Sequence, residues 1–222
     1  MGPNGAGKTT MFNVLTGVLR PQAGRVTLQN RDVTRWDVSR RASRGISRTF
    51  QVTNLMHTMT VEDNVVLALA ASRPTVRRNA IRPLRSSRLY VAAADLLGEW
   101  GLSARQKVPV RSLSYGEQRE LELVLAVAGE PKVLLLDEPA AGLSPAETER
   151  VCQLVNRLPR STSIVLIEHD LDMALELSDT VTVMAEGTIR GTGNADDPAI
   201  SALVQDVYIG VGADEEDVDA AG

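Results

Sequence analysis

Cysteine is almost absent from this chain, because only Cys152 among its 222 residues is a cysteine. A single cysteine cannot form a disulfide within the chain, which favours a reducing compartment such as the cytoplasm. Long apolar runs are also absent, since the longest wholly apolar stretch is residues 65–71. A membrane-spanning helix needs about 18 apolar residues, so we expect no part of this sequence to cross a bilayer.

Charge is present in ordinary amounts but is unevenly placed. Charged residues make up 23% of the chain, hydrophobic residues 43%, and the net charge is −4, which is typical of one globular domain with a sizeable core. One stretch without an acid contains six arginines: Arg73, Arg77, Arg78, Arg82, Arg85 and Arg88. Two interpretations of it stay open: a solvated helix face, or a docking surface for lipid headgroups or an acidic partner. Five acids within residues 214–219 predict an acidic disordered tail over residues 211–222.

Strands and helices are predicted to alternate along the chain. A glycine-rich loop over residues 2–10 precedes a helix that we expect to run through Leu19. The further predictions are a hairpin (25–33), a strand (45–50), a mainly helical region (61–130), a strand (132–136), a helix (147–158), a strand (163–167), a helix (170–177) and two strands (180–185 and 188–191). This alternation predicts an α/β fold with a largely parallel sheet.

The glycine-rich loop matches the phosphate-binding pattern G-x-x-x-x-G-K-[S/T] in full over residues 2–9. Glycines let the backbone N–H groups wrap around a phosphate, and the helix that follows presents its positive end to the same anion. Lys8 is predicted to contact the β- and γ-phosphates, and the Thr9 hydroxyl to ligate Mg²⁺. A tight turn without a ligand is the simpler alternative, which the complete match disfavours. The nucleotide-binding candidates here are Asn4, Gly5, Ala6, Gly7, Lys8, Thr9 and Thr10.

A hydrophobic strand over residues 133–136 leads directly into two acids, Asp137 and Glu138. Taken alone, these acids would only end a strand in solvent. Beside a phosphate loop they predict a Walker B pattern, in which Asp137 holds Mg²⁺ and Glu138 polarises the attacking water as a general base. The carboxyl end of such a strand is where open α/β sheets bind their ligands.

The segment Leu-Ser-Tyr-Gly-Glu-Gln over residues 113–118 carries the family assignment. Ser114 and Glu117 form a capping-box pattern before an amphipathic helix, so an ordinary capped core helix would explain it locally. Between a phosphate loop and an acidic strand, however, it resembles the LSGGQ signature of ABC ATPases, with Tyr115 in the third place. A helix start also attracts anions, which fits contact with a nucleotide.

The resemblance to ABC ATPases covers nearly the whole chain and implies further roles. Gln51 matches the Q-loop glutamine, which contacts Mg²⁺ and the attacking water and links the site to the membrane subunit. His169 matches the H-loop histidine, a γ-phosphate contact. Residues 141–144 match the D-loop, with Ser144 where aspartate is usual. Two cassettes of this family pair head to tail, so Ser114 and Gly116, with Glu117 of the same segment, are expected to reach the partner's ATP.

The resemblance also implies the architecture. We expect a P-loop NTPase (RecA-like) core with an α-helical subdomain over about residues 54–125 and a partial antiparallel β subdomain, all within one domain of residues 1–210. Members of the family usually have some tens of residues before the loop, including an aromatic that stacks on adenine and a strand leading into the loop. Here Met1 directly precedes Gly2. We therefore expect the N-terminal strands to be absent, and the chain as written to bind ATP weakly or to fold poorly.

Residues 12–17, 48–51, 140–143 and 207–210 are similar to phrases in the ATPases of branched-chain amino-acid importers. This resemblance implies ATP and Mg²⁺ as cofactors, transmembrane permease subunits and a second, identical or different, ABC ATPase as partners, and a periplasmic or extracellular solute-binding protein as an indirect one. It also implies no nucleic-acid partner, and a peripheral location on the cytoplasmic face of the membrane. A urea or amide importer ATPase, and a truncated nucleotide-binding module with little turnover, remain alternatives. An ABC ATPase of DNA repair or the ribosome would normally add a long coiled coil or a second cassette.

Overall fold

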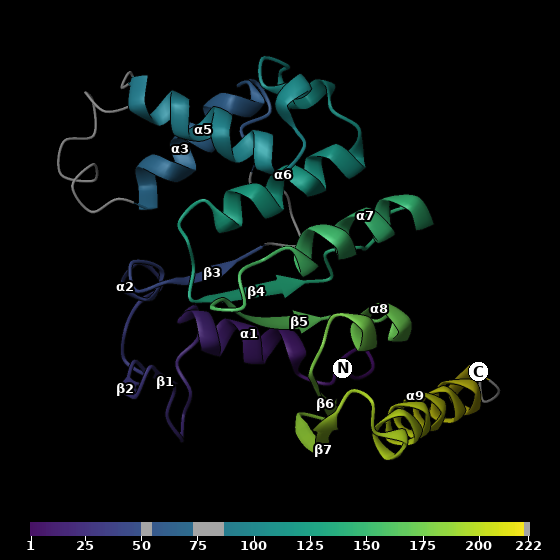
Figure 1. Cartoon of the computed structure of the whole chain (residues 1–222). Helices are drawn as coiled ribbons and strands as arrows, with labels where there is room; N and C mark the ends of the chain where they lie inside the picture. Colours follow the sequence, from purple (N-terminus) through teal and green to yellow (C-terminus); the bar gives the residue numbers. More distant parts are fainter. Residues whose placement is uncertain (50–54, 73–86, 220–222) are drawn as a thin grey trace.

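The computed structural model describes residues 1–49, 55–72 and 87–219, and its elements alternate as the sequence predicts (Figure 1). In chain order these are α1 (Lys8–Thr16), β1 (Thr27–Leu28), β2 (Arg31–Asp32), α2 (Val38–Ala42), β3 (Ile46–Arg48), α3 (Val61–Ser72), α5 (Ser87–Glu99), the short helices η2 (Ser103–Arg105) and η3 (Val110–Ser112), α6 (Tyr115–Val127), β4 (Val133–Asp137), α7 (Pro145–Asn156), β5 (Ser163–Ile167), α8 (Leu171–Glu176), β6 (Thr180–Ala185), β7 (Thr188–Asn194) and α9 (Pro198–Asp219). The predicted α/β class is confirmed.

A parallel sheet of order β3-β4-β5 forms the centre of the molecule. Its middle strand, β4, is buried on both faces, and successive side chains of a strand point to opposite faces. Leu135 packs with Phe12 of α1, whereas Leu134 and Leu136 pack with residues of α6 and α7. Figure 1 shows α1 on one side of this sheet and α6 and α7 on the other. The α1 helix and the α6 helix therefore cover opposite faces of one sheet.

The strands β6 and β7 form an antiparallel hairpin below that sheet. Its turn holds Glu186 at φ 50° and Gly187 at φ 74°, the backbone conformation that tight two-residue hairpin turns require. Met1 runs beside β6: its nitrogen donates to the Thr182 carbonyl at 2.7 Å, and the Met184 N–H donates to its carbonyl at 2.9 Å. The start of the glycine-rich loop is thereby attached to β6.

The helices α3, α5 and α6 form a separate lobe around their own apolar core (Figure 1). Val61, Val65, Leu97 and Leu121 are completely buried in it. This agrees with the predicted helical region, although its arginine-rich part lies mostly outside the described residues; Arg88 is described and is exposed.

The end of α1 differs from the prediction, because the helix stops at Thr16 rather than continuing to Leu19. Gly17 takes φ 85°, the left-handed conformation that ends helices. The buried Arg41 guanidinium then donates through Nη1 to the last carbonyls, Val14 O at 2.6 Å and Leu15 O at 2.7 Å. A cation at this end also matches the helix dipole, so the two effects fix the boundary.

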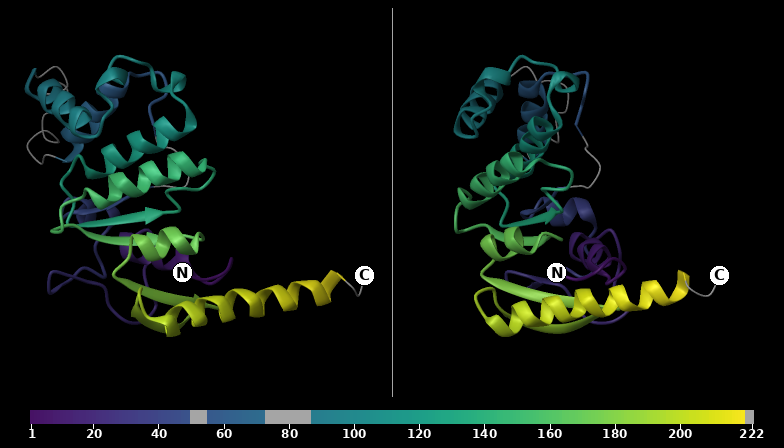
Figure 2. Two further views of the ribbon diagram at one scale, coloured as in Figure 1. Left: turned by 45° about the vertical axis from the view of Figure 1, so that its right-hand side comes forward. Right: turned by 90° about the vertical axis from the view of Figure 1, so that its right-hand side faces the viewer.

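The C-terminal segment forms α9, which runs to Asp219 and so includes residues 211–219 of the predicted tail. The first half of α9 is anchored by Ile200 and Val204, which pack against Val181 and Val183 of β6. A helix that has been nucleated by packing extends at little further cost. Figure 2 shows the second half of α9 projecting from the body of the protein. The division of the chain into a domain of residues 1–210 and a tail stays a prediction.

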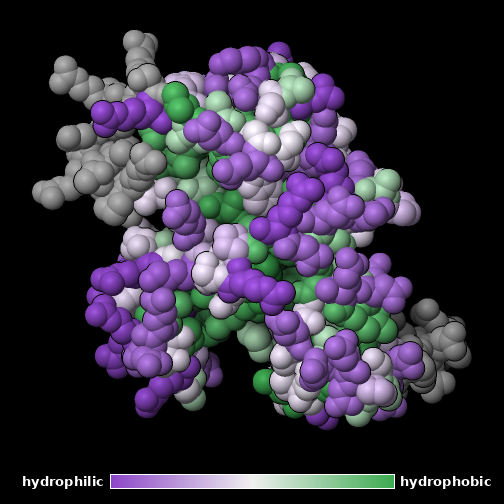
Figure 3. Space-filling model, viewed as in Figure 1, coloured by the Kyte–Doolittle hydropathy of each residue, from purple (hydrophilic) through white to green (hydrophobic). Residues whose placement is uncertain are grey.

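No helix within residues 1–49, 55–72 and 87–219 is both long and apolar enough to cross a bilayer. Hydrophilic side chains cover most of the face seen in Figure 3.

Candidate nucleotide site

The phosphate loop has the backbone that its glycines make possible. Gly2 takes φ 148°, and a Cβ there would lie 2.0 Å from the Met184 carbonyl oxygen of β6, so only glycine fits. Gly7 takes φ 92° as the N-cap residue of α1. The hydroxyl of Tyr208 in α9 donates to Gly2 O at 3.0 Å and accepts from Gly2 N at 3.3 Å. Tyr208 thus holds the loop, a contact that sequence reasoning missed.

Lys8 is folded over the loop, with only 8% of its surface exposed. Its ammonium donates to the carbonyls of Gly2 and Pro3, the latter at 2.8 Å. Burial lowers the pKa of Lys8, while the charges of Glu138 and Asp137 oppose that shift. The lysine predicted to bind phosphate therefore lies near both acids of the predicted Walker B pattern.

The other predicted residues of the loop differ in exposure. Ala6 is buried, and its N–H donates to Pro3 O at 3.3 Å, which closes the turn. Exposed residues are found at the tip of the loop and in the first turn of α1: Asn4, Gly5, Thr9 and Thr10. The exposed side chains are accessible to a ligand approaching from solvent.

Asp137 ends β4 as a nearly inaccessible carboxylate, 1% exposed. Its Oδ2 accepts from Arg48 Nη2 at 2.6 Å, and its N–H donates to Thr49 Oγ1 at 3.3 Å. Its Oδ1 is buried and has no hydrogen-bond partner in the described part of the chain. A buried carboxylate oxygen without a donor is suited to a hard cation such as Mg²⁺.

Glu138 follows immediately but turns its side chain toward solvent, where it meets His169. The distance from Glu138 Oε1 to His169 Nε2 is 2.8 Å, and the side chains are 24% and 37% exposed. Glu138 takes φ 48°, an uncommon conformation for a residue with a side chain and one that is often found at functional sites. The Glu138 N–H donates to Ile167 O at 2.9 Å, which joins the ends of β4 and β5.

Glu168, between β5 and His169, is a functional candidate that sequence reasoning missed. It is 5% exposed; its Oε1 accepts from Ala140 N at 3.2 Å and its Oε2 from His169 N at 2.9 Å. Burial raises the pKa of Glu168, against the opposing effect of these backbone hydrogen bonds. The only signal in the sequence was an acid placed directly after an apolar strand, beside the histidine.

The signature segment has the predicted capping box. Ser114 Oγ accepts from Glu117 N at 3.2 Å, and Glu117 Oε2 accepts from Ser114 N at 2.9 Å. Burial tends to raise the pKa of Glu117, but hydrogen bonds to Ser114 and the charge of Arg105 outweigh it and leave that pKa lowered. Gly116 is buried, and a Cβ there would lie 2.2 Å from Glu147 Oε1.

Tyr115 connects this segment to the D-loop of the same chain. Its hydroxyl donates to Ala141 O at 3.1 Å and accepts from Arg119 Nε at the same distance. At the end of the D-loop, Ser144 donates to Glu147 Oε2 from its backbone nitrogen at 2.9 Å and from its hydroxyl at 2.7 Å. Serine here caps α7, where the family usually has aspartate.

The structure thus gathers Lys8, Asp137, Glu138 and His169 at the carboxyl ends of β4 and β5. The signature residues lie instead at the start of α6, which covers the opposite face of the sheet from α1. That the signature serves a partner's nucleotide stays a prediction. Gln51 lies outside the described residues.

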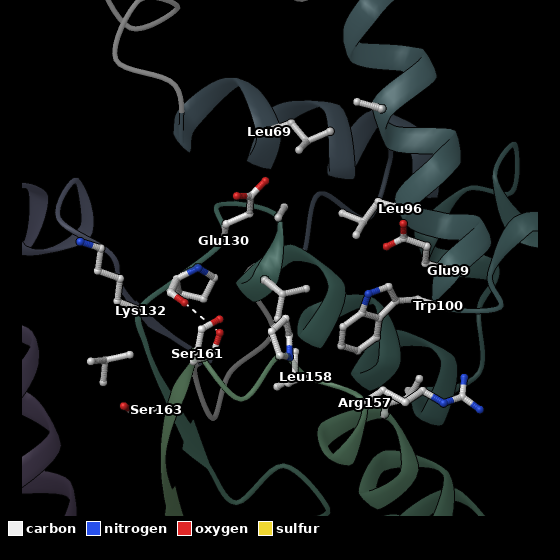
Figure 4. Close-up of a pocket in the computed structure, with 18 of the residues that line it drawn as sticks. Leu69, Leu96, Glu99, Trp100, Glu130, Lys132, Arg157, Leu158, Ser161 and Ser163 are labelled. Carbon is white, nitrogen blue, oxygen red and sulfur yellow. Dashed lines mark hydrogen bonds between the residues drawn. The ribbon is translucent and has the colours of Figure 1, made fainter.

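A large hollow in the structure is remote from this site. It has a volume of about 1230 Å³ and lies at the opposite edge of the sheet, where Lys132 precedes β4 and Ser163 begins β5. Figure 4 shows Trp100 and Leu158 on its wall, with Glu99 and Glu130 nearby. It contains none of the residues predicted to bind nucleotide.

Comparisons with known proteins agree with this geometry. The family model described as ABC transporter matches residues 1–141. The high-affinity branched-chain amino acid transport ATP-binding protein LivG of Salmonella typhimurium is 36% identical, over 95% of this chain and 85% of that protein. The protein of that description named BraF, from Pseudomonas aeruginosa, is 34% identical with the same two coverages.

A solved structure extends the agreement to the fold. The ADP conformation of MJ1267, an ATP-binding cassette of an ABC transporter, is similar with a TM-score of 0.79 and 29% identity, over 95% of this chain and 86% of that one. The matches in family, sequence and fold cover the phosphate loop, the paired acids and the signature segment together. The chain therefore belongs to the ABC transporter family, as an ATP-binding subunit that hydrolyses ATP.

Proposed function

We propose that this ATPase couples MgATP hydrolysis to the import of branched-chain amino acids through separate transmembrane permease subunits. The hydrolytic part of this proposal is supported by the contact between Glu138 Oε1 and His169 Nε2 at 2.8 Å, beside Lys8. The solute is supported by relatives that are named as branched-chain amino acid transport proteins, with 36% and 34% identity over 95% of this chain.

In this proposal the phosphate loop and Lys8 bind the nucleotide phosphates, and Thr9, Gln51 and Asp137 hold Mg²⁺. The orphaned Oδ1 of Asp137 supports a metal there. Bound Mg²⁺ neutralises developing charge on the phosphates.

Glu138 is the general base in this proposal, since it is exposed enough to contact a water and its orientation is fixed by His169. His169 also serves as a hydrogen-bonding contact for the γ-phosphate, and Gln51 as a contact for the attacking water.

The proposed assembly contains a second cassette, identical or different, whose nucleotide is contacted by Ser114, Gly116 and Glu117 of this chain. Ser114 is exposed at the start of α6, where the helix N-terminus favours an anion. The permease holds the pair on the cytoplasmic face of the membrane as peripheral subunits. A periplasmic or extracellular solute-binding protein acts only indirectly, through the permease.

The test replaces the chromosomal codon for Glu138 to give Glu138→Gln in the source cells. We expect uptake of labelled leucine, isoleucine and valine to be lost, while uptake of labelled urea stays unchanged. A matched variant, Glu186→Gln, removes an exposed acid from the β6–β7 turn and should leave all uptake unchanged. Loss of urea uptake with normal leucine uptake would instead assign a urea importer.

A further inference from the structure

Arg48 is a buried cation that contacts two parts of the nucleotide site. It is the last residue of β3, and its side chain is 9% exposed. Its Nη2 donates to Asp137 Oδ2 at 2.6 Å and its Nη1 to Asn13 Oδ1 at 2.7 Å. Its guanidinium carbon lies 5.5 Å from the centre of the Phe12 ring. One side chain therefore joins the helix after the phosphate loop to the acid at the end of β4.

The pairing has a clear physical reason. A carboxylate that is 1% exposed, as Asp137 is, is strongly disfavoured in the ionised form unless a cation lies beside it. Arg48 supplies that charge to Oδ2, while Oδ1 stays without a donor in the described part of the chain. The Asp137 carboxylate is thus half satisfied, with one oxygen held by the protein and the other available.

We propose that Arg48 is the resident counter-cation of Asp137 in the nucleotide-free protein and that a divalent metal arriving with the nucleotide displaces it. This proposal rests on the proposed role of Asp137 as a metal ligand. A dication bound to Oδ1 would share one small carboxylate with the guanidinium. Two cations that contact the two oxygens of one carboxylate in a poorly solvated site repel each other strongly. The metal and the guanidinium therefore compete for Asp137.

The exchange is confined to a side chain, because the main chain around it is fixed. Thr49 N donates to Leu135 O at 3.0 Å, and Asp137 N donates to Thr49 Oγ1 at 3.3 Å. Neither bond involves the guanidinium. Arg48 is therefore a positioning residue, since it acts on the metal only through its contact with Asp137.

The test measures binding of a fluorescent ADP analogue to the full chain, first in EDTA and then along a Mg²⁺ titration. The midpoint of the titration is the Mg²⁺ concentration that produces half of the Mg²⁺ effect on binding of the analogue. In Arg48→Gln we expect this midpoint to fall by about tenfold, within the usual range for linked binding events. Affinity for ADP in EDTA should fall, because Asp137 then faces the phosphates without a counter-charge. A merely structural role for Arg48 would instead weaken binding in EDTA and in Mg²⁺ alike, which would overturn the proposal.

Two further variants keep the result interpretable. Arg48→Lys retains the charge but not the forked contact, so it should shift the Mg²⁺ midpoint in the same direction by less; an unchanged midpoint in this variant overturns the proposal even where Arg48→Gln does not fold. Asn13→Ala removes the hydrogen bond between Arg48 and Asn13 and should leave the midpoint of the Mg²⁺ titration near that of the wild type.

Asp137→Asn separates this proposal from the proposed function. If Asp137 is a metal ligand, Asp137→Asn removes most of the Mg²⁺ effect on ADP binding. A normal Mg²⁺ effect in Asp137→Asn contradicts the proposed function and the exchange together. A lost effect in Asp137→Asn combined with an unchanged midpoint in both Arg48 variants contradicts the exchange alone.

Discussion

Asp137 and Glu138 are neighbours in the sequence, but their carboxylates have different environments. Asp137 is 1% exposed and paired with a buried arginine at 2.6 Å, whereas Glu138 is 24% exposed and meets a half-exposed histidine at 2.8 Å. The difference arises at the end of β4, where Glu138 leaves the strand with φ 48° and turns away from the sheet.

Two adjacent residues therefore provide two kinds of acid. A buried, charge-paired carboxylate is suited to a fixed electrostatic role, because moving it or protonating it disrupts the core. An exposed carboxylate oriented by one hydrogen bond can exchange a proton with water at little cost to the fold. Substitutions around Asp137 and substitutions around Glu138 should therefore affect different properties of the protein.

The largest effect is expected for Glu138→Gln. Loss of the general base should lower ATP turnover by about 10²- to 10⁴-fold, while the free energy of unfolding stays close to that of the wild type because the pair is exposed. Phosphate release and urea denaturation measure the two quantities on one sample. Glu186→Gln is the matched control, since Glu186 is an exposed acid in contact with a basic side chain, that of Arg190. Wild-type turnover in Glu138→Gln would show that Glu138 is not the general base.

The next largest effect is expected for Arg48→Met, on stability rather than on turnover chemistry. Removing the guanidinium leaves the Asp137 carboxylate buried without a cation, which should lower the free energy of unfolding by about 3–5 kcal/mol. Adding Asp137→Asn to Arg48→Met removes the unpaired charge, so the double variant should recover part of that loss. Arg190→Met, at an exposed pair, should change stability by less than about 1 kcal/mol. Equal effects of the two single arginine variants would contradict the comparison.

A smaller effect on turnover is expected for His169→Ala. The histidine orients Glu138 through one hydrogen bond to a charged group, which is worth about 1.5–3 kcal/mol, so turnover should fall by about 10- to 100-fold. His57 is the other histidine of the chain and is exposed, so His57→Ala is the control and should hydrolyse ATP normally. If His57→Ala and His169→Ala lose the same activity, the contact with Glu138 is not the cause.

The smallest effect concerns Glu168, a buried acid that has backbone donors instead of a cation. Burial raises its pKa above the usual glutamate value. A carboxyl group whose pKa is higher in the folded state binds its proton more tightly there. Its contribution to stability is therefore present below the unfolded-state pKa and is lost as the pH rises through the folded-state pKa.

Glu168→Gln should therefore remove a decline in stability over the weakly acidic range just above the ordinary glutamate pKa. Urea denaturation at a series of pH values measures the difference between wild type and variant. The substitution also changes hydrogen bonds, which shifts the free energy of unfolding by an amount that does not vary with pH. Only the slope of the free energy of unfolding against pH therefore tests the prediction. Glu149→Gln, at an exposed position of α7, should follow the wild-type slope. Parallel curves for wild type and Glu168→Gln would exclude the predicted shift.

Much of the fold was predictable from local patterns. The residues of β5 and β6 match the predicted ranges, because a short aliphatic strand and a turn at Glu186 are local signals. The predicted end of α1 was wrong, since apolar spacing continued past Gly17 while the glycine and the distant Arg41 ended the helix. Packing at Ile200 and Val204 anchors the first half of α9, whereas the disorder expected for residues 211–222 from their acids stays a prediction.

The candidate site was predictable as a set of motifs but not as a set of contacts. The phosphate-loop and Walker B patterns predicted Lys8, Asp137 and Glu138, and the family resemblance predicted His169; their roles stay predictions. The partner of Asp137 could not be read from the sequence, since Arg48 lies 89 residues earlier and meets it only through the register of β3 and β4. Glu168 was overlooked because burial of an acid is decided by the tertiary structure.

The central claim, that Glu138 is the base of a site completed by a second cassette, is tested most directly by size-exclusion chromatography with light scattering. The sample is Glu138→Gln, with and without MgATP. Our account predicts a monomer without nucleotide and a stable dimer with MgATP, because ATP that is not hydrolysed stays between the two subunits. The dimer should be formed either by this chain alone or with the second ATPase of its transporter. A protein that binds MgATP but stays monomeric in both cases would contradict the account.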